Sequence, residues 1–226
     1  MPAERSIPPT IVAIVADAKD PNVRRVRVGR RCVAELLVDD VAALKLAPGK
    51  PWTPALEARV ARVQARADAR RDALRMLARA GVASSRLRER LQRKGHEPTI
   101  AAEVVAALAG DGWLSDEAFA EAAATSMQRR GALPKSTIAA RLASRGVDES
   151  TAERVADRKG ATDDLAACLA AATKLSRSTA GARRAAGSAA QAEARRTAAA
   201  LARRGFDPDT IETTLRRLGL DLEARE

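Results

Sequence analysis

Short apolar runs mark the first part of the chain. The runs are rich in β-branched residues, and turn-forming residues separate them, at Asp20–Asn22 and at Gly29–Arg30. Runs of this length between turns are typical of β-strands. The pattern therefore predicts a small antiparallel meander over residues 11–38, with strands in the runs 11–15, 23–28 and 32–38.

After this segment the apolar spacing changes to three or four residues, which is the period of a helix. Thr53 and Pro54 form a cap followed by a proline in the first turn, and apolar residues then recur from Leu56 onward. A long helix is predicted from Pro54 to about Ala80. Before it, Asp39 and Asp40 are expected to cap a short helix over residues 41–46.

From about residue 72 onward one pattern occurs three times. In each case an amphipathic helix ends in a basic residue and a glycine, namely Lys94-Gly95, Arg145-Gly146 and Arg204-Gly205. The basic side chain complements the helix dipole, and the glycine can adopt the left-handed conformation that ends a helix. A second helix follows each glycine, over 98–109, 149–158 and 208–218, and an acid-led helix opens each unit, beginning at Asp72, Asp116 and Asp163.

This recurrence predicts stacked helical units, because a unit of about 50 residues buries little apolar surface alone. The expected fold is mainly α, with three tandem three-helix repeats in an elongated array, preceded by a small antiparallel β segment. The third unit has extra length near residues 178–191, which form either a loop or a helical extension. The expected divisions are a β-rich segment with a short helix (1–53), the start of a long linking helix (54–71), repeat 1 (72–115), repeat 2 (116–160) and repeat 3 (161–226).

The composition supports thin helical packing over one thick core. Hydrophobic residues make up 46% of the 226 residues, but aromatic residues only 2%, and much of the apolar content is alanine. Burial of apolar surface stabilises a fold by about 25 cal/mol per Å², and each alanine side chain buries little surface. Leucine and valine are therefore expected to fill the seams between closely spaced helices.

The charge balance points to a polyanionic partner. Lysine and arginine total 40 against 29 acidic residues, which gives a formal net charge of +11. Arginine makes paired hydrogen bonds to phosphates and carboxylates, so binding to DNA, or to a partner that carries DNA, is favoured. The alternative is an arginine-rich, solvated helical surface with no such partner.

The basic residues are clustered, which favours contact with a phosphate backbone. Because aromatic residues that could stack on bases are scarce, we expect backbone contact without base recognition. The candidate contact residues are Arg86, Arg88, Arg90, Arg93, Lys94, Arg129, Arg130, Lys135, Arg141, Arg145, Arg183, Arg184, Arg195, Arg196, Arg203 and Arg204.

No constellation of residues in the sequence suggests catalysis. The sequence has neither a phosphate-binding GxxxxGK[ST] loop nor a GxGxxG turn, and its single histidine, His96, is expected in a loop. Cys32 and Cys168 lie far apart in the sequence, so neither a zinc site nor a disulfide framework is expected. We therefore expect no enzymatic activity, no catalytic residue, no cofactor and no metal.

The sequence also bears on the location of the protein. The N-terminal residues lack the apolar core of a signal peptide, and no stretch approaches the roughly 20 apolar residues of a membrane span. A cytoplasmic protein without a membrane partner is expected, with a monomer as the simplest oligomeric state.

The most specific motif lies between the first two repeats. Residues 112–120 read Gly-Trp-Leu-Ser-Asp-Glu-Ala-Phe-Ala, and they resemble the Gly-x-Leu-(Asp/Ser)-Asp-x-x-Phe-Ala box of the RecX family of regulatory proteins. The box residues are Gly112, Leu114, Asp116, Phe119 and Ala120. Together with the basic-glycine helix ends, the resemblance covers about residues 72–219. Phe119 and the neighbouring Trp113 are both expected to pack between helices.

The resemblance implies a function that the charge alone does not specify. Members of this family are similar in lying in the groove of the RecA–DNA filament and restraining RecA in recombination, ATP hydrolysis and co-protease activity. The expected role is thus in DNA repair, recombination and the SOS response, with the RecA filament and the DNA backbone as partners. The alternative is a general, basic DNA-binding architectural protein that acts without RecA.

Overall fold

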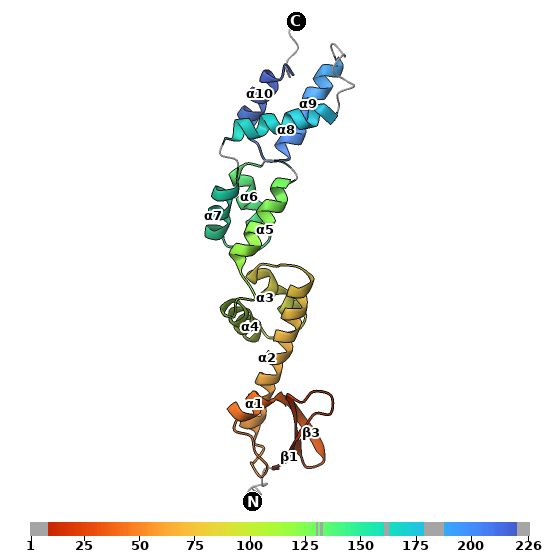
Figure 1. Cartoon of the computed structure of the whole chain (residues 1–226), viewed down its shortest axis with the longest axis vertical. Helices are drawn as coiled ribbons and strands as arrows, with labels where there is room; N and C mark the ends of the chain where they lie inside the picture. Colours follow the sequence, from red (N-terminus) through yellow and green to blue (C-terminus); the bar gives the residue numbers. More distant parts are fainter. Residues whose placement is uncertain (1–8, 130, 132, 161–162, 179–187, 221–226) are drawn as a thin grey trace, which may run out of the picture. The chain divides into compact units, whose positions relative to one another are not determined.

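The computed structural model describes residues 9–129, 131, 133–160, 163–178 and 188–220. Over these residues the protein is mainly helical, with one small three-stranded antiparallel sheet near the N-terminus (Figure 1). The chain divides into two compact units. Unit 1 comprises Met1–Ala80 with Arg88–Leu108, and unit 2 comprises Gly81–Leu87 with Ala109–Glu226.

The sheet of unit 1 confirms the predicted meander. Its strands are β1 (Ile11–Ala16), β2 (Val23–Val28) and β3 (Arg31–Leu37), paired in the order β1-β2-β3. Gly29 makes the tight turn between β2 and β3 with a φ of 56°, a conformation that glycine adopts without strain.

One face of this sheet forms a core with α2 (Pro54–Arg79), the predicted long helix. Because α2 runs without a break through Asp72, the expectation that a helix begins at Asp72 was wrong. Val26 and Leu36 from the sheet pack with Trp52, Leu56 and Val60. The helix begins as predicted, with Pro54 in its first turn and the Thr53 hydroxyl accepting a hydrogen bond from the Leu56 N–H at 3.2 Å. Trp52 is buried, so it is a packing residue.

The short helix α1 (Val38–Ala43) differs from the prediction. It begins three residues earlier than expected, and Asp39 and Asp40 lie within its first turn. Its N-cap residue is Leu37, with no side-chain cap. The two carboxylates still lie at the positive end of the helix dipole, so the acids indicated a helix start but not the capping position.

Two further helices follow α2, namely α3 (Ser84–Arg93) and α4 (Pro98–Gly110). In unit 1, Leu91, Ile100, Val104 and Leu108 are almost completely buried. The apolar residues at helical spacing in the sequence are therefore the buried residues of these helices, as predicted.

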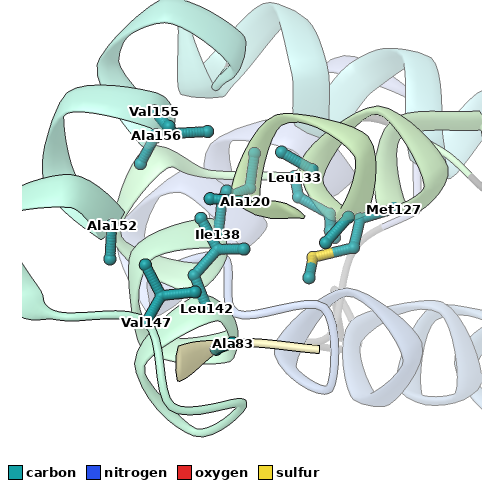
Figure 2. Packing of buried hydrophobic residues seen from close by; sticks show 12 residues of the cluster. Ala83, Ala120, Met127, Leu133, Ile138, Leu142, Val147, Ala152, Val155 and Ala156 are labelled. Carbon is teal, nitrogen blue, oxygen red and sulfur yellow. The ribbon is translucent and has the colours of Figure 1, made fainter. Parts of the chain in front are cut away.

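Unit 2 contains two helical cores. The first is formed by α5 (Asp116–Arg129), α6 (Lys135–Ala143) and α7 (Glu149–Lys159), together with Ala83. Figure 2 shows Ile138, Leu142 and Val155 converging in this core among alanine side chains. The second core is formed by α8 (Asp164–Ser178), α9 (Ser188–Ala202) and α10 (Pro208–Arg217). The predicted extra length near 178–191 lies mostly outside the described residues.

Aspartates cap three helices of unit 2, as their positions in the sequence predict. Asp148 accepts from the Thr151 N–H at 2.9 Å, and Asp207 accepts from the Thr210 N–H at 2.8 Å. Asp163 accepts from the first turn of α8 at 2.9 and 3.2 Å. Each side chain satisfies backbone donors that would otherwise lack a partner at the helix start.

The glycine turns of unit 2 contact the helices that precede them. The Ser85 hydroxyl of α3 donates to the Gly146 carbonyl at 2.7 Å, and the Arg86 guanidinium donates to the Ser144 carbonyl at 2.9 Å. In the same way Thr137, near the start of α6, lies over Gly205 and donates to its carbonyl at 3.5 Å. The same kind of contact thus occurs twice along the chain.

A search of the described helices finds none that combines the length and the apolar character needed to cross a membrane.

Candidate nucleic-acid interface

Three of the predicted contact residues make interactions within the protein. Lys94 and His96 both bind the carboxylate of Asp72, with His96 Nε2 2.9 Å from Asp72 Oδ2. Lys135 pairs with Asp157 at 3.1 Å, and Arg86 holds the Gly146 turn as described above. The charges of Lys94 and Lys135 are therefore partly neutralised by acids, and the side chain of Arg86 is held in place by its hydrogen bond.

The Asp72 carboxylate is the centre of an ionic cluster in unit 1. Its side chain is only 13% exposed, and hydrogen bonds from Lys94 and then His96 lower its pKa below the ordinary value. The predicted loop position of His96, after α3, is confirmed. The cluster ties α2 to the turn between α3 and α4, and its contacts are those of a structural ion pair.

A second set of predicted residues is available for contact with a partner. These arginines are exposed, and no ion pair or hydrogen bond of their side chains occurs among the described residues. They lie on α3, at the end of α5, on α9 and just after α9. The set consists of Arg88, Arg90, Arg93, Arg129, Arg195, Arg196 and Arg203.

Three more predicted residues come together at one place in unit 2. Arg141 from α6, Arg145 from the turn after it, and Arg204 from the turn after α9 line a single cavity of about 230 Å³. The sequence places Arg204 about 60 residues from the other two, so this grouping depends on the packing of α9 against the preceding helices. Arg130, Arg183 and Arg184 lie outside the described residues.

Other arginines of unit 2 are neutralised by acids. Glu117 on α5 accepts hydrogen bonds from Arg158 at 2.6 Å and Arg154 at 3.4 Å, and Arg158 also pairs with Glu121. The hydrogen bond from Arg158 lowers the pKa of Glu117 and raises that of Arg158. Arg154 and Arg158 thus hold α7 on α5.

The five residues of the sequence box form a turn, pack in a core or cap a helix. Gly112 has a φ of 76°, Leu114 and Ala120 are buried, and Phe119 packs on the edge of the first core of unit 2. The Asp116 carboxylate accepts a hydrogen bond at 2.7 Å from the Ser84 N–H, at the start of α3. Asp116 therefore caps a helix 32 residues earlier in the chain, a role that its position at the start of α5 did not reveal.

The expectation for Trp113 was wrong. We expected it to pack between helices, but its side chain is 64% exposed in the turn between α4 and α5. An exposed tryptophan is unusual and is often found at protein interfaces. Of the two adjacent apolar residues in this turn, Leu114 is buried and Trp113 is exposed.

The described residues contain no group of three histidine, cysteine or acidic side chains that could hold a metal ion. Cys32 is exposed, and Cys168 is buried in the second core of unit 2, where burial raises its pKa. The arrangement thus offers guanidinium groups at the surface and in one cavity, which bind anions through charge-assisted hydrogen bonds.

Comparisons with known proteins agree on one family. A curated protein named Regulatory protein RecX, from Chromohalobacter salexigens, is 36% identical over 106 residues, which are 47% of this chain and 69% of that protein. No protein-family model matches the chain. A crystal structure of regulatory protein RecX superposes with a TM-score of 0.71 at 16% identity, covering 92% of this chain and 99% of the other. The crystal structure of RecX from Lactobacillus salivarius gives a TM-score of 0.54 at 18% identity, covering 70% and 98%.

Proposed function

The chain belongs to the RecX family of regulatory proteins, and on this basis we propose that it binds the RecA nucleoprotein filament and restrains RecA. The restrained activities are strand exchange, DNA-dependent ATP hydrolysis and co-protease activity. The protein acts without a reaction of its own, as a monomer in the cytoplasm.

The observation that carries this proposal is the set of exposed arginines on α3, at the end of α5, on α9 and just after α9, which have no partners among the residues that the structure describes. A filament of RecA on DNA presents phosphate and carboxylate groups, and guanidinium groups bind both. The exposed Trp113 adds an apolar anchor of the kind found in protein interfaces. A protein that contacts only the phosphate backbone of DNA needs the arginines but not such an anchor.

We further propose that the helices form three tandem units with the divisions given by the sequence. The two contacts at Gly146 and Gly205 support this, because they join a glycine turn to a helix start 61 and 68 residues earlier, respectively. Stacked units of this kind would present basic residues at regular intervals to a helical partner.

The test is the rate of ATP hydrolysis by RecA on single-stranded DNA, with this protein substoichiometric to RecA. The proposal predicts a decrease at protein concentrations that leave bare DNA largely unbound. An unchanged rate under these conditions, with DNA binding intact, would favour an architectural protein that acts without RecA. Trp113→Ala is expected to weaken the effect on RecA and to leave bare-DNA affinity unchanged, whereas Arg129→Glu is expected to weaken both.

A further inference from the structure

One cavity in unit 2 is lined by three arginines and, among the described residues, by no acidic side chain. It has a volume of about 230 Å³ and is lined by Met127, Gly131, Leu133, Arg141, Arg145 and Arg204. Three of the six lining residues are arginines, and the other three are apolar or glycine. This volume is several times the roughly 30 Å³ that one water molecule occupies in the liquid.

None of the three guanidinium groups has an acidic partner within the described part of the chain. Arg141 and Arg145 form no ion pair there, and Nη1 of Arg204 is buried without a hydrogen-bond partner. A buried charged donor without an acceptor is strongly unfavourable, and three like charges at one cavity repel each other. Both features are relieved by an anion in the cavity.

The fold places these groups by the repeated helix ends. Arg145 and Arg204 each precede a glycine turn, and Arg141 lies one helical turn before Arg145. Gly131 leaves room for the third group, because a Cβ atom there would lie 3.1 Å from Nη1 of Arg204. Met127 and Leu133 are buried and give the cavity an apolar wall, which strengthens charge-assisted hydrogen bonds.

From this geometry we propose that the cavity binds a phosphate group. Each guanidinium offers several N–H donors in a plane, and three guanidinium groups around one cavity provide enough donors for the several oxygens of a phosphate. Within the described part of the chain the lining of the cavity includes no aromatic side chain that could stack on a base, so the ligand is recognised by its phosphate. The site deepens the phosphate-contact part of the proposed function and does not depend on RecA.

The test uses the full chain with ¹⁵N-labelled arginine and inorganic phosphate at constant ionic strength set by chloride. The arginine Nε–Hε signals report binding at individual side chains. We expect saturable shifts in the wild type, and a loss of phosphate affinity of about tenfold or more in Arg204→Gln, since a hydrogen bond to a charged group is worth about 1.5–3 kcal/mol. Arg217→Gln is the matched control, because it removes the same charge from an exposed residue of the same unit that lies outside both the cavity and the predicted contact set.

Arg141→Gln serves as a second variant if Arg204→Gln does not fold. Three outcomes would overturn the proposal: no saturable binding of phosphate beyond that of chloride, equal weakening in the Arg217 and Arg204 variants, or acetate binding as tight as phosphate. None of these outcomes would contradict the proposed effect on RecA, which is measured in a separate experiment.

A second arm of the experiment identifies the source of the phosphate. A short single-stranded oligonucleotide is titrated in place of phosphate. If the ligand is the DNA backbone, Arg204→Gln lowers oligonucleotide affinity more than Arg217→Gln, and phosphate competes with the oligonucleotide. If the ligand is a free phosphate or a nucleotide, phosphate binding is lost in Arg204→Gln while the two variants bind the oligonucleotide equally.

Discussion

Replacing Gly146 by alanine tests how tightly the turns of unit 2 are packed against preceding helices. Gly146 has a φ of 90°, and a Cβ atom there would lie 2.7 Å from Cγ of Arg86 and even closer to the Ser85 hydroxyl. Both atoms are near the backbone of α3, so neither can swing away freely. Gly112 is the matched control, because it lies in the same unit with a φ of 76° and nothing within 4 Å of its Cβ position.

The expected magnitudes follow from these contacts. Left-handed backbone costs a residue other than glycine about 1–2 kcal/mol, and this term is common to both variants. Gly146→Ala adds about 1–3 kcal/mol from overpacking, and about 1 kcal/mol if the hydrogen bond from Ser85 breaks. We therefore expect Gly146→Ala to destabilise unit 2 by about 1–4 kcal/mol more than Gly112→Ala does.

The assay is urea unfolding followed by hydrogen exchange of amides in α6 and α7, which reports unit 2 separately from unit 1. Introducing Ser85→Ala as well should reduce the cost of Gly146→Ala, because it removes the closest atom. Equal destabilisation by Gly112→Ala and Gly146→Ala would refute the packing described for this turn, and with it the main structural support for stacked units.

Three further predictions concern titratable groups and cysteines. Asp148→Ala should destabilise α7 by about 1 kcal/mol through loss of its cap. Hydrogen bonds from Ser150 and then Thr151 lower the pKa of Asp148 from 3.8 to about 2. The contribution of Asp148 to stability is therefore complete above pH 4 to 5 and is lost as the pH falls toward 2. Asp148→Asn should keep the cap and remove that part of the acid dependence of unfolding, as followed by circular dichroism. Asp72→Asn should speed amide exchange at the turn after α3, and its cost should vanish in acid, because the pKa of Asp72 is lowered. With a thiol reagent Cys32 should react at once and Cys168 only on unfolding; prompt reaction of both would contradict the burial of Cys168.

Local signals in the sequence predicted the three strands and most of the helices, but not the start of α1 and not the absence of a helix start at Asp72. Proline at position 54, capping aspartates such as Asp148 and Asp207, and the spacing of leucines gave helix bounds within one or two residues of those observed. These signals work because caps and apolar periodicity act over one or two helical turns. They failed at α1, where Asp39 lies inside the first turn.

The candidate site could be predicted only as a set of basic residues. Which arginines are bound by acids depends on contacts between distant segments, such as Lys135 with Asp157 and Arg158 with Glu117. The cavity at Arg204 depends on the packing of α9, and no local pattern marks it. The sequence also could not show that Trp113 is exposed, since an apolar residue before a helix is usually buried.

The measurement that tests the central claim most directly is cosedimentation of this protein with preformed RecA filaments, at a salt concentration where it no longer binds bare single-stranded DNA. Binding through DNA phosphates alone weakens steeply with salt, so any remaining association reports the filament itself. We expect saturable cosedimentation with the filament, reduced in Trp113→Ala. Association that disappears at the same salt concentration for filament and bare DNA would contradict the proposed role as a regulator that recognises the RecA filament.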